Sequence, residues 1–194
     1  MKYQICVSGS SRGEAVEKNR AVSYEIGKAI ARADCTLLTG ATVGIPDNAA
    51  RGCKAAGGQS IGVSPASTRL EHTKKYNLPT ASYDFILYTG LHYIGRDSLL
   101  ISSADAIIII GGRIGTLHEF SIALELDKPI GILEGSGGTS QWFDELLEAA
   151  GMQKLTSRHV LMDSNPEKLV KRIKALLDKE RELEKPSDEL SQRA

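Results

Sequence analysis

Short apolar segments alternate along this chain with longer amphipathic ones, a pattern typical of βαβ units and a parallel sheet. The clearest apolar segment contains four consecutive isoleucines, Ile107 to Ile110, which fit a strand covered on both faces better than a helix. The apolar segments predict strands at Gln4–Val7, Thr36–Thr39, Ser60–Val63, Phe85–Tyr88, Ala106–Ile110, Ile130–Leu133 and His159–Met162. We therefore expect an α/β fold, a Rossmann-like, doubly wound and mainly parallel sheet of about 6–7 strands with helices on both faces.

The segments between these strands have helical periodicity. In the first of them Val22, Ile26 and Ile30 form an apolar stripe, and Pro166 is a good start signal for the last. The helices are predicted at Ala15–Ala33, Asp47–Ala56, Tyr93–Ser103, Leu117–Leu126, Gln141–Ala150 and Glu167–Lys179. A chain of 194 residues fits one domain, so we expect a single domain over residues 1–179 and a charged, disordered tail over residues 180–194.

Composition excludes several classes of partner. Lysine plus arginine equal aspartate plus glutamate at 24 each, and only 5% of residues are aromatic, which argues against nucleic acid as a partner. No apolar run reaches the roughly 18 residues of a membrane-spanning helix, so we expect no membrane partner. Cys6, Cys35 and Cys53 form no CxxC pair, which favours reduced, buried thiols in a cytoplasmic protein.

Three glycine-containing turns each follow a predicted strand and precede a predicted helix. They are Ser8–Gly13, Gly40–Gly44 and Gly111–Thr116. Parallel strands bring all three turns to one edge of the sheet, where the free N–H groups at helix starts can bind an anion. A tight turn needs glycine for steric reasons alone, so one such turn indicates little. Three in one chain predict a site for a nucleotide phosphate.

The stretch Ser64–Tyr83 has little periodicity and contains Pro65 and Pro79. Loops of this length, about twenty residues, are uncommon in a compact domain and are usually functional or mobile. Because this one follows the third predicted strand, we place it at the same edge of the sheet, where it could act as a lid.

Two charged residues, Arg96 and Glu119, are predicted to approach this edge from adjacent βαβ units. Glu119 stands three residues after Thr116, so the pair also fits a T-x-x-E capping box without any role in binding. Arg96 could likewise form a surface salt bridge without any role in binding. Local sequence alone favours the capping box for Glu119 and the salt bridge for Arg96 over a functional role. We expect His118 to face another side of the helix from Glu119 and to be structural, and the histidines show no metal-ligand spacing.

The spacing of these residues resembles a known family. Arg96 is followed fifteen residues later by the loop Gly111–Thr116, and then by Glu119. This pattern is similar to that of the "lonely guy" (LOG) family, long mislabelled lysine decarboxylases, in which an arginine precedes P-G-G-x-G-T-x-x-E. LOG proteins hydrolyse cytokinin riboside monophosphates. The resemblance extends to the turn Ser8–Gly13 and to residues 40–46 and 56–65, and covers roughly residues 4 to 135.

The resemblance implies a nucleoside 5′-monophosphate phosphoribohydrolase, which cleaves the N-glycosidic bond to give a free base and ribose 5-phosphate. Arg96 and Glu119 would be the catalytic pair. The residues that would bind the phosphate or nucleotide are Gly9, Ser10, Ser11, Gly40, Gly111, Gly112, Arg113, Gly115 and Thr116. It further implies a small-molecule nucleotide as partner, no metal, no cofactor, and a homodimer with the arginine-bearing helix near the interface.

The sequence departs from the LOG pattern at positions that leave a second function open. The family's proline is Gly111 here, its second glycine is Arg113, and the lysine after its arginine is Asp97. With Gly135–Thr139, these changes resemble a sister branch that includes molybdenum-cofactor carrier proteins. The alternative is therefore a non-catalytic carrier or sensor of a nucleotide or molybdopterin-type cofactor. A third hypothesis, a single-strand DNA-processing protein with a similar turn, is disfavoured by the zero net charge and few aromatics.

Overall fold

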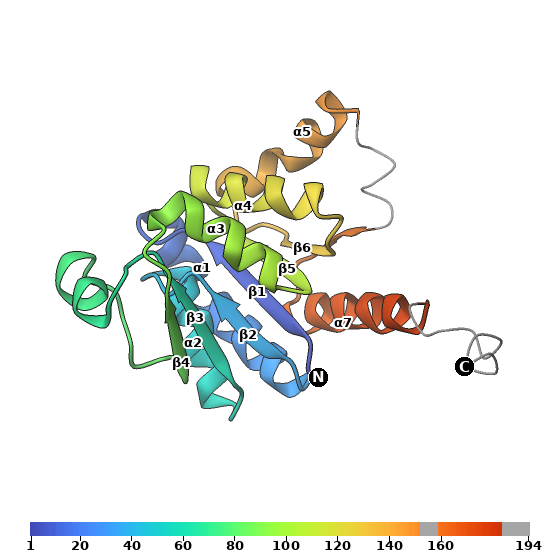
Figure 1. Cartoon of the computed structure of the whole chain (residues 1–194). Coiled ribbons are helices and arrows are strands. Elements are labelled where there is room, and N and C mark those ends of the chain that lie inside the picture. Colours follow the sequence, from blue (N-terminus) through green and yellow to red (C-terminus); the bar gives the residue numbers. More distant parts are fainter. Residues whose placement is uncertain (152–158, 184–194) are drawn as a thin grey trace, which may run out of the picture.

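The strands assemble into one seven-stranded sheet in the order β4-β3-β2-β1-β5-β6-β7, with every pair of neighbours parallel (Figure 1). The computed structural model describes residues 1–151 and 159–183. The strands are β1 (Gln4–Gly9), β2 (Thr36–Thr39), β3 (Ser60–Ser64), β4 (Phe85–Tyr88), β5 (Ala106–Ile110), β6 (Ile130–Leu133) and β7 (Val160–Asp163). The predicted Rossmann-like, doubly wound α/β fold is confirmed.

Helices cover both faces of the sheet. They are α1 (Glu14–Arg32), α2 (Ile45–Ala55), α3 (His92–Ser103), α4 (Ile114–Glu125), α5 (Phe143–Ala149) and α7 (Pro166–Leu183), with a π-helical turn η1 (Glu71–Lys75) and a 3₁₀ turn η2 (Gly138–Trp142). Helices α1, α2 and α7 pack on one face and α3, α4 and α5 on the other, so the core has two layers. Within β5, Ile108 belongs to the first layer and Ile107 to the second, which explains why that strand is apolar at every position.

The direction of winding reverses between β1 and β5. The chain runs outward from β1 to β4, crosses back through α3 to β5 beside β1, and then continues to β7 (Figure 1). In open α/β sheets ligands bind at such a switch point, outside the carboxyl ends of the strands. Gly9 at the end of β1 is in register with Ile110 at the end of β5, and a Cβ on Gly9 would lie 2.6 Å from the Ile110 carbonyl oxygen. Glycine therefore lets the two strand ends, and the turns that follow them, approach closely.

Several helix boundaries differ from those predicted. Helix α4 begins at Ile114, three residues early, because the positive φ angles of Gly111 (63°) and Gly112 (110°) complete the turn in fewer residues. Helix α2 begins at Ile45, directly after Gly44 with φ 82°. At the other end of the chain, α7 continues to Leu183, so residues 180–183 are helical and not part of a tail. The remainder of the predicted tail, residues 184–194, lies outside the described residues.

Two further predictions concern the thiols and the membrane. Cys6, Cys35 and Cys53 are all buried and free, as their sequence context predicted. Among the helices of residues 1–151 and 159–183, none combines the length and the apolar character needed to span a bilayer.

Candidate functional site

A pocket of about 190 Å³ lies at the carboxyl ends of β1 and β5. All three glycine turns contribute to its wall, which contains Arg96, Glu119 and the predicted phosphate-binding residues except Gly111 and Gly112. Residues outside the predicted catalytic and binding set also line it, namely Val7, Ser8, Thr42, Pro46, Tyr93 and Asp97. The topology therefore brings the candidate catalytic pair and most of the candidate binding residues to one place.

Gly111 and Gly112 shape the turn without lining the pocket. The Gly111 N–H donates a hydrogen bond to Ser136 Oγ at 2.8 Å, and the Gly112 carbonyl accepts one from the Thr139 N–H at 3.1 Å. A Cβ on Gly112 would lie 2.5 Å from the Thr116 side chain. Gly112 thus permits the close approach of Thr116, and the glycine-rich segment Gly135–Thr139 supports the turn from behind.

The first turn of α4 forms part of the pocket wall. The helix begins after Arg113, which makes no side-chain capping bond, so Thr116 is the third residue of the helix and not its cap. The Glu119 carboxylate accepts a hydrogen bond from Ser8 Oγ on β1. The capping-box interpretation of Thr116 and Glu119 is therefore wrong. The first N–H groups of a helix have no partner within it, and two of the residues that carry them, Gly115 and Thr116, face the pocket.

Burial controls the ionisation of Glu119, which is only 9% exposed. Desolvation, with a smaller contribution from the negative charge of Asp97, raises the pKa of Glu119 to about 7, although Arg96 and the Ser8 hydrogen bond oppose the shift. A carboxyl group that is half ionised near neutral pH suits proton transfer, and such groups are concentrated in functional sites.

The free energy of unfolding should fall as the pH rises from about 4.5 to 7. The unfolded chain loses the Glu119 proton near pKa 4.5, whereas the folded chain retains it to about 7, so this contribution is complete below 4.5 and lost as pH rises through 7. The contribution is on the order of 3 kcal/mol. Urea denaturation of the wild type and Glu119→Gln at several pH values would measure it. Glu119→Gln should lack this component, and equal pH slopes for the two proteins would contradict the assignment.

Arg96 enters the pocket from α3 as a buried guanidinium, 4% exposed. Its Nη2 lies 3.3 Å from Asp97 Oδ1, while Nε and Nη1 have no hydrogen-bond partner among the described residues. Gly40 makes this position accessible, because a Cβ there would lie 1.7 Å from Nη1. The surface salt bridge considered for Arg96 is therefore wrong. Unsatisfied buried N–H groups are costly, and an anion in the pocket would satisfy them. Ser10 Oγ, also buried without a partner, adds a further donor to the wall.

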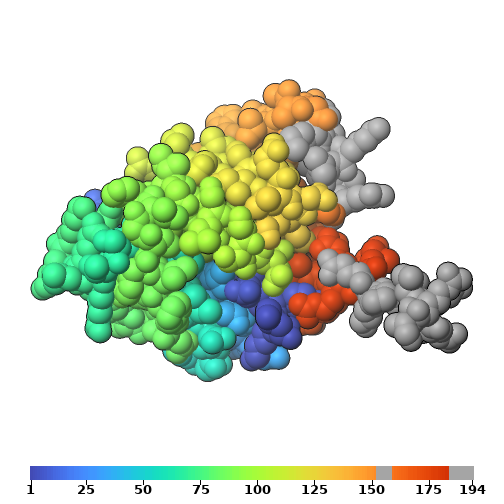
Figure 2. Space-filling model, in the orientation of Figure 1, coloured from blue at the N-terminus to red at the C-terminus, as the bar shows by residue number. Residues whose placement is uncertain are grey.

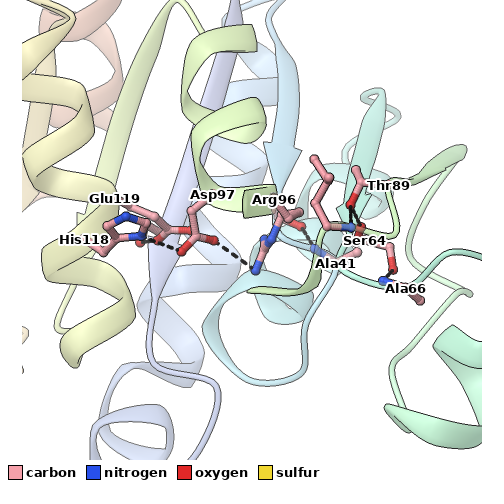
Figure 3. Close-up of polar contacts among 11 residues, drawn as sticks. Ala41, Ser64, Ala66, Thr89, Arg96, Asp97, His118 and Glu119 are labelled. Atoms are coloured by element: carbon pink, nitrogen blue, oxygen red, sulfur yellow. Dashed lines mark hydrogen bonds and ion pairs between the residues drawn. The ribbon is translucent and has the colours of Figure 1, made fainter. Parts of the chain in front are cut away.

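Asp97 links Arg96 to a histidine that the sequence did not place at the site. In Figure 3 the Asp97 carboxylate lies between the Arg96 guanidinium and the His118 ring, whose Nδ1 is 3.0 Å from Asp97 Oδ2. His118 is not among the residues that line the pocket, and its contact with Asp97 connects it to the site. The only feature of the sequence that could have placed Asp97 and His118 at the site is their position, since Asp97 follows Arg96 and His118 precedes Glu119.

The pocket can therefore bind an anion and act on a bond beside it. Arg96, Ser10 and the start of α4 supply donors, and Glu119 supplies a carboxyl group near its point of ionisation. Within the described ranges, no group of three or more His, Cys, Asp or Glu residues is arranged to hold a metal ion.

Comparison with known proteins identifies relatives of the whole fold. The model of the SLOG cluster4 family matches residues 2–170. An uncharacterized protein of Archaeoglobus fulgidus is 30% identical over 131 residues, which are 68% of this chain and 80% of that protein. Among solved structures, TM1055 has a TM-score of 0.76 at 25% identity, with coverage of 90% of this chain and 99% of that one. The molybdenum cofactor carrier protein of Chlamydomonas reinhardtii has a TM-score of 0.73 at 27% identity, with coverage of 92% and 99%.

Proposed function

The chain belongs to the SLOG cluster4 family, a LOG-like family as its motifs predicted, and on this premise we propose that it is a nucleoside 5′-monophosphate phosphoribohydrolase. It would bind the nucleotide phosphate in the pocket between β1 and β5 and hydrolyse the N-glycosidic bond, releasing a free base and ribose 5-phosphate.

One observation carries this proposal: a buried arginine with two unpartnered nitrogens shares a pocket with a carboxyl group whose pKa is near 7. Hydrogen bonds from a charged guanidinium bind phosphate strongly, and Nε and Nη1 of Arg96 are donors without a partner among the described residues. The first turn of α4, with Gly115 and Thr116, would hold the remaining phosphate oxygens.

Glu119 would act on the ribose. Cleavage of an N-glycosidic bond builds positive charge on the sugar ring, which a nearby carboxylate stabilises. Ionised Glu119 would take a proton from the attacking water as its oxygen bonds to C1′. The C1′–N bond breaks at the same time, and the base leaves with the bonding electrons and takes up a proton from solvent. Glu119 then releases the proton that it took from water to solvent and returns to its ionised form. The hydrogen bond from Ser8 Oγ orients the carboxylate for this step.

Product analysis tests the proposal. Purified protein incubated with AMP, GMP, CMP and UMP should release free base and ribose 5-phosphate from at least one of them, as measured by chromatography. The matching nucleosides are the control, and they should react much more slowly because Arg96 and the start of α4 would have no phosphate to bind. If no nucleotide yields base above the protein-free background, the phosphoribohydrolase proposal fails.

A second candidate function, a carrier of a molybdopterin-type cofactor or nucleotide, is supported by the similarity to the Chlamydomonas molybdenum cofactor carrier protein at 27% identity. The unpartnered nitrogens of Arg96 suit the phosphate of such a cofactor as well as that of a nucleotide. A carrier would raise its melting temperature with the ligand and return the ligand chemically unchanged, which mass spectrometry would show. Release of free base during the same incubation would exclude a purely non-catalytic carrier.

We also propose a homodimer formed through α3 and β4. Strand β4 is at the edge of the sheet, and Phe85 on it and Ile94 on α3 are 59% and 75% exposed. Leu87 and Leu91 are also exposed apolar residues of this region. The segment that contains β4 and α3 is green in Figure 2 and lies at the surface of the view. Exposed apolar patches often mark protein–protein interfaces.

Ile94→Glu should convert the dimer to a monomer in sedimentation experiments, because it places a charge on the most exposed of these four apolar side chains. Leu126→Glu is the matched control: Leu126 is an exposed apolar residue, 46% accessible, at the end of α4. A wild-type chain that sediments at its monomer mass of 20.9 kDa would refute the dimer.

A further inference from the structure

A second cavity of about 320 Å³ adjoins the pocket and shares Ser11, Thr42 and Tyr93 with it. Its outer wall includes Tyr76 and Asn77 from the segment between β3 and β4. Ligand pockets are typically about 300–1,000 Å³, so the first pocket alone, at about 190 Å³, is small for a complete nucleotide. The two cavities together reach the size that a nucleotide requires.

The side chains of the second cavity suit a flat heterocycle better than a second phosphate. The Tyr76 and Tyr93 rings lie edge to face with their centroids 5.6 Å apart, and Tyr93 is 45% exposed, which leaves ring surface available for stacking. The Asn77 amide is exposed and offers both a donor and an acceptor to the edge of a base. Arg12 on the facing turn adds a planar cation that stacks on aromatic rings.

The segment that carries Tyr76 and Asn77 is fixed to the sheet. His72, in the π-helical turn η1, is fully buried; its Nδ1 lies 2.8 Å from Ser64 Oγ at the end of β3, and its Nε2 lies 2.9 Å from the Pro79 carbonyl oxygen. Figure 3 shows Ser64 held in turn by contacts with its neighbours Ala66 and Thr89. This is the segment that the sequence suggests as a lid. In the structure, the buried His72 anchors it to the end of β3, and its residues Tyr76 and Asn77 form part of the cavity wall.

A further contact joins this wall to the helix that carries Arg96. Tyr76 Oη lies 3.0 Å from Nδ1 of His92, the first residue of α3. Asn77 has φ 53°, which is in the left-handed region of backbone conformation. This backbone conformation determines the direction in which the Asn77 side chain leaves the chain. The second cavity is therefore preformed at a fixed position relative to the Arg96 pocket.

We propose that the second cavity is the base subsite, which holds a purine or pterin-like bicyclic heterocycle of the ligand whose phosphate binds at Arg96. This inference rests on the proposed function, because it takes the Arg96 pocket as the phosphate site. Stacking on one of the two tyrosine rings, contact with the edge of the other and hydrogen bonds to Asn77 supply the recognition. The ribose would lie where the two cavities meet, with Glu119 on the wall of the first.

Calorimetric titration with AMP, GMP and ribose 5-phosphate tests the base subsite. It is done in a Glu119→Gln background so that the ligands stay intact. Asn77→Gly removes the amide at a position whose positive φ glycine accepts, and Tyr76→Ala removes one ring. Each substitution should weaken AMP or GMP binding about tenfold, since base–aromatic stacking and hydrogen bonds have energies of this order. Neither should change ribose 5-phosphate binding by more than about twofold, because that ligand has no base to bind there.

Two controls separate this inference from the proposed function. Arg96→Ala should weaken all three ligands, and Leu126→Ala, far from both cavities, should weaken none. If AMP and GMP bind no more tightly than ribose 5-phosphate, or if Asn77→Gly and Tyr76→Ala weaken all ligands equally or none, the base subsite is refuted while the phosphate site stands. If none of the three ligands binds the Glu119→Gln protein without further substitutions, the proposed function fails, and the base subsite fails with it.

Discussion

Replacing Glu119 with glutamine should lower kcat for base release at least about 100-fold while leaving nucleotide affinity within a few-fold of the wild type. Glutamine keeps the size of the side chain and still accepts the hydrogen bond that Ser8 Oγ donates. It cannot take a proton from water and cannot offset positive charge on the ribose. The loss should therefore fall on the chemical step, and single-turnover measurements at saturating nucleotide would show it.

The pH profile gives an independent readout of the same residue. Since burial raises the pKa of Glu119 to about 7 and the ionised form is the active one, wild-type kcat/KM should rise up to pH 7 and level off above it. The residual activity of Glu119→Gln should lack this limb. Glu125→Gln, an exposed carboxylate on the same helix, is the control and should behave as the wild type. If Glu119→Gln has the kcat of the wild type and its kcat/KM still rises up to pH 7, Glu119 is not the general base.

The sheet was predictable because each strand is encoded locally. A run such as Ile107–Ile110 is apolar at every position only because both faces of β5 are covered, and this signal needs no knowledge of the rest of the chain. The common edge of the three turns followed from the handedness of parallel βαβ connections. The helix starts were less predictable, because the φ angles of Gly111 and Gly112 decide where α4 begins, and glycine adopts many conformations.

The burial of Arg96 and Glu119 was not predictable from local sequence. Each residue has an ordinary local interpretation, a salt bridge or a cap, and only the packing of α3 and α4 against β1 decides between these and a functional pair. The Ser8–Glu119 hydrogen bond joins residues 111 positions apart, and the His118–Asp97 contact joins residues 21 positions apart. Helix and strand periodicity relates residues only a few positions apart, so neither contact could be read from the sequence pattern. The fifteen-residue spacing between Arg96 and Gly111 was informative only through the family resemblance.

Gly40→Ala should weaken nucleotide binding about 100-fold or more, as much as Arg96→Ala does, because the charged hydrogen bonding from Arg96 to the phosphate would be lost. The added Cβ would lie 1.7 Å from Arg96 Nη1 and less than 3 Å from Cζ and Nη2, so the guanidinium has to leave its position. A guanidinium at the end of a flexible side chain can move, and the substitution should therefore reduce affinity far more than it reduces the melting temperature.

The combination of the two substitutions distinguishes this mechanism from a general disturbance of the turn after β2. Once Arg96 is alanine, the atoms that the Gly40 Cβ meets are gone, so Gly40→Ala should cost no further affinity in the Arg96→Ala background. Calorimetric titration of the wild type, both single variants and the double variant with the same nucleotide closes this cycle. Full additivity of the two losses would show that Gly40 acts independently of Arg96. The expected non-additivity follows from a direct steric contact, since the glycine is needed here only to leave space for the guanidinium.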